Sequence, residues 1–346
     1  MSLTFNPCDR LLVIAPHPDD ESLATGGLLQ RARQGGAAVR VLFATNGDNN
    51  PWPQRWVEKR WQIGQRERRR WGALRRREAR FALKKLDFQG ESRFLHFPDQ
   101  GITSKLLQAD PATLDTLCAE LENWKPTCLI LPSSYDLHPD HNALYVLLQI
   151  ALDRVRRPDL PQFHFLVHCR RPDLVPRRQD IHLSEHERHL KRQAILCHGT
   201  QMVLSRERFL AYARPQESYF KPAPVEALMP NHRVNEAFLH AGALNLAFTL
   251  PPGLGKESVI FIAAESPTAG SQRWRLKLPA STRVVPVVDA ATDALLRHAT
   301  VRITGRLARV KIPIASLQPL SRLFVKFHRR AIFLDDAGWR EVPVGA

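Results

Sequence analysis

The sequence predicts an α/β protein in which a mostly parallel sheet carries helices on both faces, followed by an all-β domain. Three observations support this prediction. Apolar runs alternate with amphipathic segments through about the first 220 residues. From about residue 235 onward, Pro and Gly punctuate short β-like runs, and helical periodicity is nearly absent. The length of 346 residues suits two domains. We therefore expect one domain over residues 1–222 and a second, sandwich-like domain over residues 235–346.

The expected strands of the first domain are continuous apolar runs, a pattern typical of strands buried on both faces. They occupy residues 11–16, 39–45, 92–97, 127–133 and 163–168. Segments with helical spacing lie between them, and the first of these ends in a Gly-Gly stop signal. These expected helices occupy residues 21–36, 53–86, 111–124, 141–156 and 184–201. The long second helix is predicted to break near Gly64 or Gly72. Strand and helix in alternation indicate a Rossmann-like sheet.

The expected strands of the second domain are shorter and follow one another without helices. Their sequences are AFLHAGALNLAFTL, SVIFIAAE, RWRLKL, RVVPVVD, ATVRITG, ARVKIPI and FVKFHRRAIFLD. Short strands separated by turn residues are typical of a sandwich of about a hundred residues.

The composition excludes several classes of protein. With 44% hydrophobic residues the chain can build a core, so it is not a disordered protein. Its five cysteines are scattered without a C-x-x-C pair, which disfavours a disulfide framework and a cysteine zinc cluster. No apolar run approaches the roughly 20 residues that span a bilayer, and the start does not look like a signal peptide. We expect a soluble cytoplasmic protein, whose net charge of +16 favours anionic partners.

Two His/Asp motifs follow predicted strands. His17-Pro18-Asp19-Asp20-Glu21 comes directly after the first strand, and His138-Pro139-Asp140-His141 follows the fourth. Parallel sheets bind ligands beyond the carboxyl ends of their strands, so the motifs would meet if these strands are neighbours. Two imidazoles and one carboxylate suit zinc or iron(II), with an open position for water. Taken singly, each motif is also compatible with a turn in which an aspartate caps the next helix.

The two motifs resemble those of the LmbE-like (PIG-L) zinc-dependent de-N-acetylases, which act on N-acetylglucosamine-type substrates. The resemblance covers about residues 8–220. Supporting stretches follow in the family's order at residues 45–48, 75–79, 97–101, 191–195 and 200–201. Thr200 stands where the family has serine. Weaker signatures lie at Leu166-Val167-His168 and at Arg214-Pro215 with Glu217.

The resemblance implies a metal site and a general base. His17, Asp20 and His141 would hold zinc, with iron(II) as the alternative metal. Asp19 would be the general base that deprotonates the metal-bound water, because a carboxylate that is not itself a ligand keeps its basicity.

The resemblance also implies roles around this centre. His138 would stabilise the oxyanion of the tetrahedral intermediate as an imidazolium, and Asp140 would accept a hydrogen bond from an imidazole. The competing interpretation of His138 is a solvated loop residue. Arg75 and Asp99 match positions that contact the sugar hydroxyls or an attached group. Arg75 has arginine neighbours on its C-terminal side, so a shift of register or a solvated helix face is the alternative.

Residues 55–80 are strongly basic, with eleven Arg or Lys residues against three Glu. Four tryptophans are interleaved with this charge: Trp52, Trp56, Trp61 and Trp71. This combination fits an anionic membrane or glycolipid surface, with the protein peripheral at the inner face of the membrane. The competing interpretation is a solvated basic face whose tryptophans pack on the sheet or on a subunit partner. Nucleic acid is disfavoured, because no known nucleic-acid-binding motif accompanies the charge.

The favoured function is a hydrolase that removes acetate from an N-acetylated amino sugar or glycoconjugate. One alternative is an iron(II) oxygenase, because His17, Asp19 and His141 also form a two-histidine, one-carboxylate pattern. The other is a non-catalytic carbohydrate- or glycolipid-binding protein. The sequence does not specify an oligomeric state.

Overall fold

A computed structural model describes residues 3–169, 178–221, 232–250, 258–317, 319–329 and 334–344. Its first sheet has seven strands in the order β3-β2-β1-β4-β5-β7-β6. The strands are β1 (Arg10–Ala15), β2 (Ala38–Thr45), β3 (Glu91–Phe97), β4 (Cys128–Pro132), β5 (Gln162–Phe165), β6 (Arg178–His182) and β7 (Gln216–Phe220). The five predicted strands are present and parallel to one another. β7 and β6, which the sequence pattern did not predict, extend the sheet as antiparallel strands.

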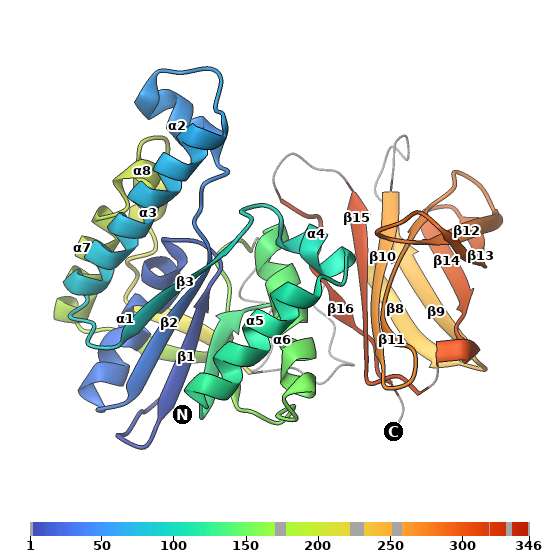
Figure 1. Cartoon of the computed structure of the whole chain (residues 1–346), viewed down its shortest axis with the longest axis horizontal. Helices are drawn as coiled ribbons and strands as arrows, with labels where there is room; N and C mark the ends of the chain where they lie inside the picture. Colours follow the sequence, from blue (N-terminus) through green and yellow to red (C-terminus); the bar gives the residue numbers. More distant parts are fainter. Residues whose placement is uncertain are drawn as a thin grey trace.

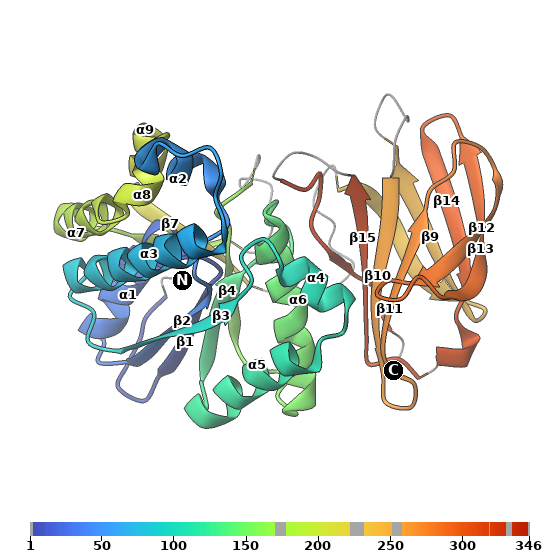
Figure 2. The ribbon, with the colours of Figure 1, turned by 45° about the horizontal axis from the view of Figure 1, so that its top comes forward.

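Helices cover both faces of this sheet, as predicted (Figures 1 and 2). Alternate side chains of β1 enter two different cores: Leu11 and Val13 pack with helices on one face, Leu12 and Ile14 with helices on the other. The first face carries α1 (Asp20–Gln34), α3 (Gln65–Lys85) and α7 (Glu185–Leu196). The second carries α4 (Ile102–Leu107), α5 (Pro111–Trp124) and α6 (Pro139–Arg154). The short α8 (Gly199–Met202) and α9 (Arg206–Leu210) follow α7.

The helix expected over residues 53–86 is two helices, α2 (Pro51–Glu58) and α3, and the break lies at Gly64. Lys59 ends α2 in a left-handed conformation, with φ of 50°. Gly64 then caps α3, and the Glu67 side chain accepts a hydrogen bond from the Gly64 N–H at 3.1 Å. Gly72 lies inside α3, where its missing side chain lets the helix approach Asn46 and Asp48.

The C-terminal region is a β domain, as expected, but its arrangement differs from a two-sheet sandwich. Its strands form one antiparallel sheet in the order β16-β15-β10-β11-β12-β13-β14-β9-β8. They are β8 (Val234–His240), β9 (Ala243–Thr249), β10 (Ser258–Ser266), β11 (Gly270–Lys277), β12 (Arg283–Asp289), β13 (Leu295–Thr304), β14 (Leu307–Pro313), β15 (Arg322–Arg329) and β16 (Arg340–Glu341). The sheet curls until its edges nearly meet, and the Arg340 side chain donates to the Val234 carbonyl at 3.0 Å. Closure lets inward side chains from every part of the sheet share one core.

The two sheets are not independent in space. Figures 1 and 2 show the β domain beside α4 and α6. Ala263, Phe324 and Trp339 of the β domain are buried in the same apolar core as α5 and α6. The join near residue 222 falls within residues 222–231, outside the described residues. In the described part of the chain, no helix is both long and apolar enough to cross a bilayer.

Candidate active site

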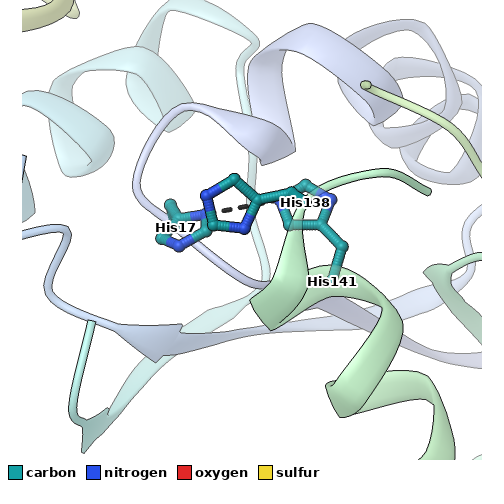
Figure 3. Close-up of side chains that lie close together, drawn as sticks. All are labelled: His17, His138 and His141. Atoms are coloured by element: carbon teal, nitrogen blue, oxygen red, sulfur yellow. Dashed lines mark hydrogen bonds between the residues drawn. The ribbon is translucent and has the colours of Figure 1, made fainter. Parts of the chain in front are cut away.

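The two His/Asp motifs meet at the carboxyl edge of the parallel sheet. β1 and β4 are hydrogen-bonded neighbours, so the turn after β1 and the loop after β4 face each other. The first motif leads into α1, and the second provides the cap and first turn of α6. Figure 3 shows the imidazoles of His17, His138 and His141 gathered in this crevice. The convergence expected from the strand order is therefore present.

Three of the predicted side chains present one ligand atom each to a common point. The Asp20 Oδ2 atom lies 3.3 Å from His17 Nδ1 and 3.2 Å from His141 Nε2. His17 Nδ1 and His141 Nε2 are 3.3 Å apart. Ligands of a tetrahedral zinc ion, with bonds of about 2.1 Å, lie roughly 3.4 Å from one another. The donor set and its spacing therefore fit a divalent zinc- or iron-type ion.

His17 also takes part in two wider groupings, with His138 and His141 and with Asp99 and Asp140. The second grouping uses the opposite ring nitrogen, because Asp140 Oδ2 and Asp99 Oδ1 each lie 3.3 Å from His17 Nε2. A carboxylate on that nitrogen is the usual partner of a metal-ligating imidazole. We therefore favour the tighter set with Asp20, which leaves Asp140 as the expected partner of an imidazole. Asp140 itself is fixed by the backbone N–H groups of Gln100 and Ile102.

Asp19 lies beside this group in a strained backbone conformation. Its φ of 144° is in a region that residues with a side chain rarely adopt. The turn is held by a hydrogen bond from the Asp19 N–H to Glu21 Oε2, at 2.8 Å. Burial raises the pKa of the Asp19 carboxyl to about 6, and the nearby Arg75 guanidinium opposes that rise. In contrast, although burial raises the pKa of Asp20, the charges and hydrogen bonds of His141 and His17 together hold it well below its usual value.

Arg75 is the arginine that enters the site, and it is 3% exposed. Its guanidinium donates to Asp19 Oδ2 at 3.0 Å, to the Pro18 carbonyl at 2.6 Å and to the Gly47 carbonyl at 2.8 Å. The solvated helix face is therefore excluded for this residue. Gly47 makes room for it, because a Cβ atom there would lie 1.9 Å from Arg75 Nη1.

His138 caps α6, and its Nδ1 accepts a hydrogen bond from the Asp140 N–H at 3.2 Å. With Nδ1 occupied as an acceptor, the neutral ring carries its proton on Nε2. Burial and the charges of His17 and His141 hold the pKa of His138 well below its usual value. Nε2 is therefore the ring nitrogen available to donate, and the imidazolium role of His138 stays a prediction. Because the ring is held as a helix cap, the alternative of a freely solvated loop is also disfavoured.

Sequence reasoning overlooked Asp136 as a functional residue. It is fully buried, and its Oδ2 lies 3.3 Å from His141 Nδ1. The same carboxylate accepts hydrogen bonds from the backbone N–H groups of His138, Val167 and His168. It therefore orients His141 and ties the loop after β4 to the chain that follows β5. The available signal was an aspartate two residues before His138, in the loop that follows a buried strand.

The site opens into a pocket of about 490 Å³. Its polar floor includes Asp19, Asp20, Arg75, Asp99 and the two imidazoles of His17 and His138. Trp52, Leu204, Phe209, Tyr212 and Leu334 form much of the apolar part of the wall. Asp99 accepts a hydrogen bond from the Asn49 N–H at 2.6 Å. Burial raises the pKa of Asp99, but its contacts with His17 hold that pKa below its usual value. The pocket thus joins a charged floor to an apolar mouth.

A mostly parallel α/β sheet with a buried His/Asp group at its carboxyl edge defines a class of proteins that bind ligands in that crevice. Residues 12–152 match the family model described as PIG-L: GlcNAc-PI de-N-acetylase. The resemblance to the PIG-L (LmbE-like) family that the motifs predicted is therefore confirmed over these residues. The matched range includes all eight predicted site residues.

Curated relatives carry deacetylase names. The chain is 30% identical over 172 residues to the 1D-myo-inositol 2-acetamido-2-deoxy-alpha-D-glucopyranoside deacetylase of Rhodococcus jostii, covering 44% of this chain and 56% of that protein. It is 27% identical over 198 residues to the probable N-acetyl-alpha-D-glucosaminyl L-malate deacetylase 2 of Bacillus subtilis, covering 56% of this chain and 83% of the relative. The chain thus spans about half the length of the Rhodococcus relative.

Among solved structures, the N,N'-diacetylchitobiose deacetylase of Pyrococcus horikoshii is similar, with a TM-score of 0.46 and 19% identity. This similarity covers 62% of this chain and 84% of that one.

Proposed function

We propose that this protein is a metal-dependent hydrolase that removes the acetyl group from an N-acetylated amino sugar or glycoconjugate. The observation that carries the proposal is that the adjacent carboxylates of Asp19 and Asp20 have different partners. One carboxylate lies between two imidazole nitrogens at ligand spacing, while its neighbour is held apart by Arg75. Residues 1–222 would form the deacetylase domain, with residues 235–346 as a second domain. The names of the relatives support this reaction.

His17, Asp20 and His141 would hold zinc or iron(II). When bound, such an ion supplies Lewis acidity and lowers the pKa of a coordinated water. Asp136 and Asp140 face the far ring nitrogens of His141 and His17, so each imidazole is oriented by a buried carboxylate.

Asp19 would act as the general base. Its carboxylate is buried and faces the pocket, so it can accept a proton from the attacking water. Arg75 would keep that carboxylate aimed at the pocket, which suits its three buried hydrogen bonds better than a contact with substrate. His138 would donate a hydrogen bond from its Nε2–H to the developing oxyanion, and the proton that Asp19 takes from the attacking water would pass to the departing amine. Asp99, which lines the pocket, would accept a hydrogen bond from a sugar hydroxyl.

The alternatives account for fewer of these features. In the iron(II) oxygenase reading, Asp19 was the metal-binding carboxylate, yet its Oδ2 contacts Arg75, and Asp20 lies between the histidines. A non-catalytic binding protein has no use for a strained, buried carboxylate beside the metal ligands.

The mouth of the pocket would meet an anionic lipid or glycolipid surface. Trp52, Trp56 and Trp61 are 48%, 68% and 79% exposed, and Trp52 also lines the pocket. Arg55 lies over the rings of both Trp52 and Trp61. Exposed aromatics beside basic residues favour the boundary between water and lipid headgroups. Trp71, by contrast, is buried and belongs to the core. We propose a cytoplasmic protein that attaches peripherally to the inner face of the membrane.

The direct test is acetate release from free, nucleotide-linked and lipid-linked N-acetylamino sugars under anaerobic conditions without a 2-oxoacid. We expect acetate from at least one of them, loss of activity on removing metal, and recovery with zinc or iron(II). His141→Ala should lose most of the bound ion. Oxygen-dependent turnover without acetate, or full metal occupancy in that variant, would overturn the proposal.

A further inference from the structure

The C-terminal β domain contacts the loop that carries the metal-site histidines. Lys326 of β15 is completely buried, and its Nζ donates to Asn142 Oδ1 at 2.9 Å. The same ammonium donates to Asp335 Oδ2 at 2.5 Å. A buried lysine is costly unless it is paired and hydrogen-bonded, and here both partners are supplied. The β domain thus places the hydrogen-bonded ammonium of Lys326 next to the start of α6.

Asn142 links this ion pair to the site because it directly follows His141. Its side-chain N–H₂ donates to the Asp136 carbonyl and to Asp335 Oδ2, each at 3.0 Å. Asp136 is the residue whose carboxylate faces His141. Asn142 is therefore a bridge whose amide oxygen bonds to Lys326 and whose amide nitrogen bonds to the loop.

The segment after β15, which includes Asp335 and Gly338, also contacts the backbone of the loop that follows β4. The Asp335 N–H donates to the Leu137 carbonyl at 2.8 Å, directly before His138. Gly338 packs so closely that a Cβ atom there would lie 1.6 Å from the Ser134 carbonyl oxygen. Leu334, in the same segment, lines the pocket. The loop from Ser134 to Asn142 is thus held on one side by β4 and α6 and on the other by the β domain.

We propose that the β domain is a positioning element for the metal site, acting through Lys326 and Asp335 on the segment that carries His138 and His141. This inference rests on the proposed role of His141 as a metal ligand. Lys326 and Asp335 are positioning residues, because they act through Asn142 and the loop backbone. Partners of this kind around metal ligands typically change metal affinity or activity by about 10- to 100-fold.

Lys326→Met removes the ammonium and keeps most of the buried volume. We expect the dissociation constant for zinc, measured by competition with a chelator, to rise by about 10- to 100-fold. The absorption bands of the cobalt(II)-substituted protein should shift, because the orientation of a ligand changes. Asn142→Ala should weaken zinc binding similarly, and the double variant should be little worse than either single variant because both break one bridge.

Arg322→Gln is the matched control. Arg322 lies on the same strand, β15, and pairs with Asp153 near the other end of the same helix, α6, at 2.8 and 2.9 Å. The change therefore breaks a contact between the same two elements, and the pair between Arg322 and Glu341 within the β domain, without touching the loop. We expect its zinc affinity and cobalt spectrum to match those of the wild type, even if its thermal stability falls.

Asp335→Asn guards against a variant that does not fold. It is nearly isosteric and leaves Lys326 without its counter-charge, so it should weaken zinc binding in the same direction but less. If folded variants, verified by near-ultraviolet circular dichroism, bind zinc as the wild type does, the positioning role is wrong. An equal loss in Arg322→Gln would also overturn it. If the wild type itself binds neither zinc nor cobalt, the proposed function fails instead.

Discussion

At the scale of single residues, the candidate site depends on one unusual turn. Asp19 and Asp20 are adjacent in sequence, yet the strained φ of Asp19 sends their carboxylates to different partners. Arg75 donates hydrogen bonds to both the Asp19 side chain and the Pro18 carbonyl. It therefore stabilises the strained backbone and also orients the Asp19 carboxylate. Strain of this kind costs about 1–3 kcal/mol and persists where the surroundings hold it in place.

Replacing Asp19 by Asn should separate catalysis from metal binding. The change is nearly isosteric, so the fold and the bound metal should survive while the base is lost. We expect kcat for acetate release to fall 10²- to 10⁴-fold, with little change in KM. Asp20→Asn is the comparison, and it should lower metal affinity first. An Asp19→Asn protein that is metal-loaded and fully active would contradict the hydrolytic mechanism.

Gly47→Ala tests whether Arg75 orients Asp19. The new Cβ would collide with the Arg75 guanidinium that bonds to Asp19, so kcat should fall on the order of tenfold to a hundredfold. Gly305→Ala is the control, because its φ of 58° resembles the 62° of Gly47 and its surroundings are open. The two changes share the backbone cost of placing alanine at positive φ, roughly 1 kcal/mol, and only Gly47→Ala adds the clash with Arg75. Equal kcat values for the two variants would contradict the proposal that Arg75 orients Asp19.

At the scale of elements, the break between α2 and α3 decides which tryptophans reach the surface. A continuous helix would carry all four along one axis, whereas the turn at residues 59–64 exposes Trp61 and leaves Trp71 packed inside. Arg70 of α3 pairs with Glu58 of α2 at 2.6 Å. α2 also forms part of the pocket wall through Trp52 and Pro53. Docking of α2 on a membrane would therefore bring the pocket mouth to the lipid surface.

The double variant Trp56→Ser, Trp61→Ser tests this docking. Wild-type protein should bind vesicles that contain anionic lipid and release them as salt rises, because headgroup attraction is screened. The variant should bind several-fold more weakly in a vesicle sedimentation assay. Phe238→Ser combined with Leu295→Ser removes two exposed apolar side chains from the β domain and should leave binding unchanged. Equally negligible binding to neutral and anionic vesicles would return residues 55–80 to a solvated basic face.

At the scale of the whole molecule, buried histidines couple stability to pH. His164 of β5 is buried against the ring of Tyr145, and burial lowers its pKa from 6.5 to about 3. His232 is similarly placed beside Tyr135, and burial lowers its pKa to about 4. Because each histidine takes up a proton more readily when unfolded, the folded state loses stability as the pH falls below 6.5.

Replacing His164 by Gln should flatten this dependence. Above pH 6.5 the histidine is neutral in both states, so it contributes no pH dependence there. Between about pH 6.5 and 5 it should account for roughly 2 kcal/mol of the decline in unfolding free energy. Urea unfolding at pH 7.5 and pH 5 measures that decline, with the exposed His240→Gln as the control. An unchanged decline in His164→Gln would mean that His164 titrates outside this range.

Much of the first sheet and the core of its site could be read from local patterns. Buried strands are recognisable as apolar runs, and the carboxyl ends of neighbouring parallel strands lie at the same edge of the sheet. Those two rules were enough to bring His17 and His141 together. The curl of the β domain into one sheet could not be predicted from the sequence, because alternating strands have the same pattern whether they form two sheets or one. β6 and β7 are short strands with a weak apolar signal, and β6 lies at the edge of the sheet.

The sequence by itself determined the fold class, the crevice and the residue types that gather in it, because backbone periodicity and strand order are local properties. Only the tertiary structure decided how those residues are held. Arg75 was distinguished from its neighbours by burial, and Asp136 by contacts with the chain after β5. Lys326 reaches Asn142 across 184 residues of sequence. Such contacts arise from the packing of distant segments, which no spacing along the chain encodes.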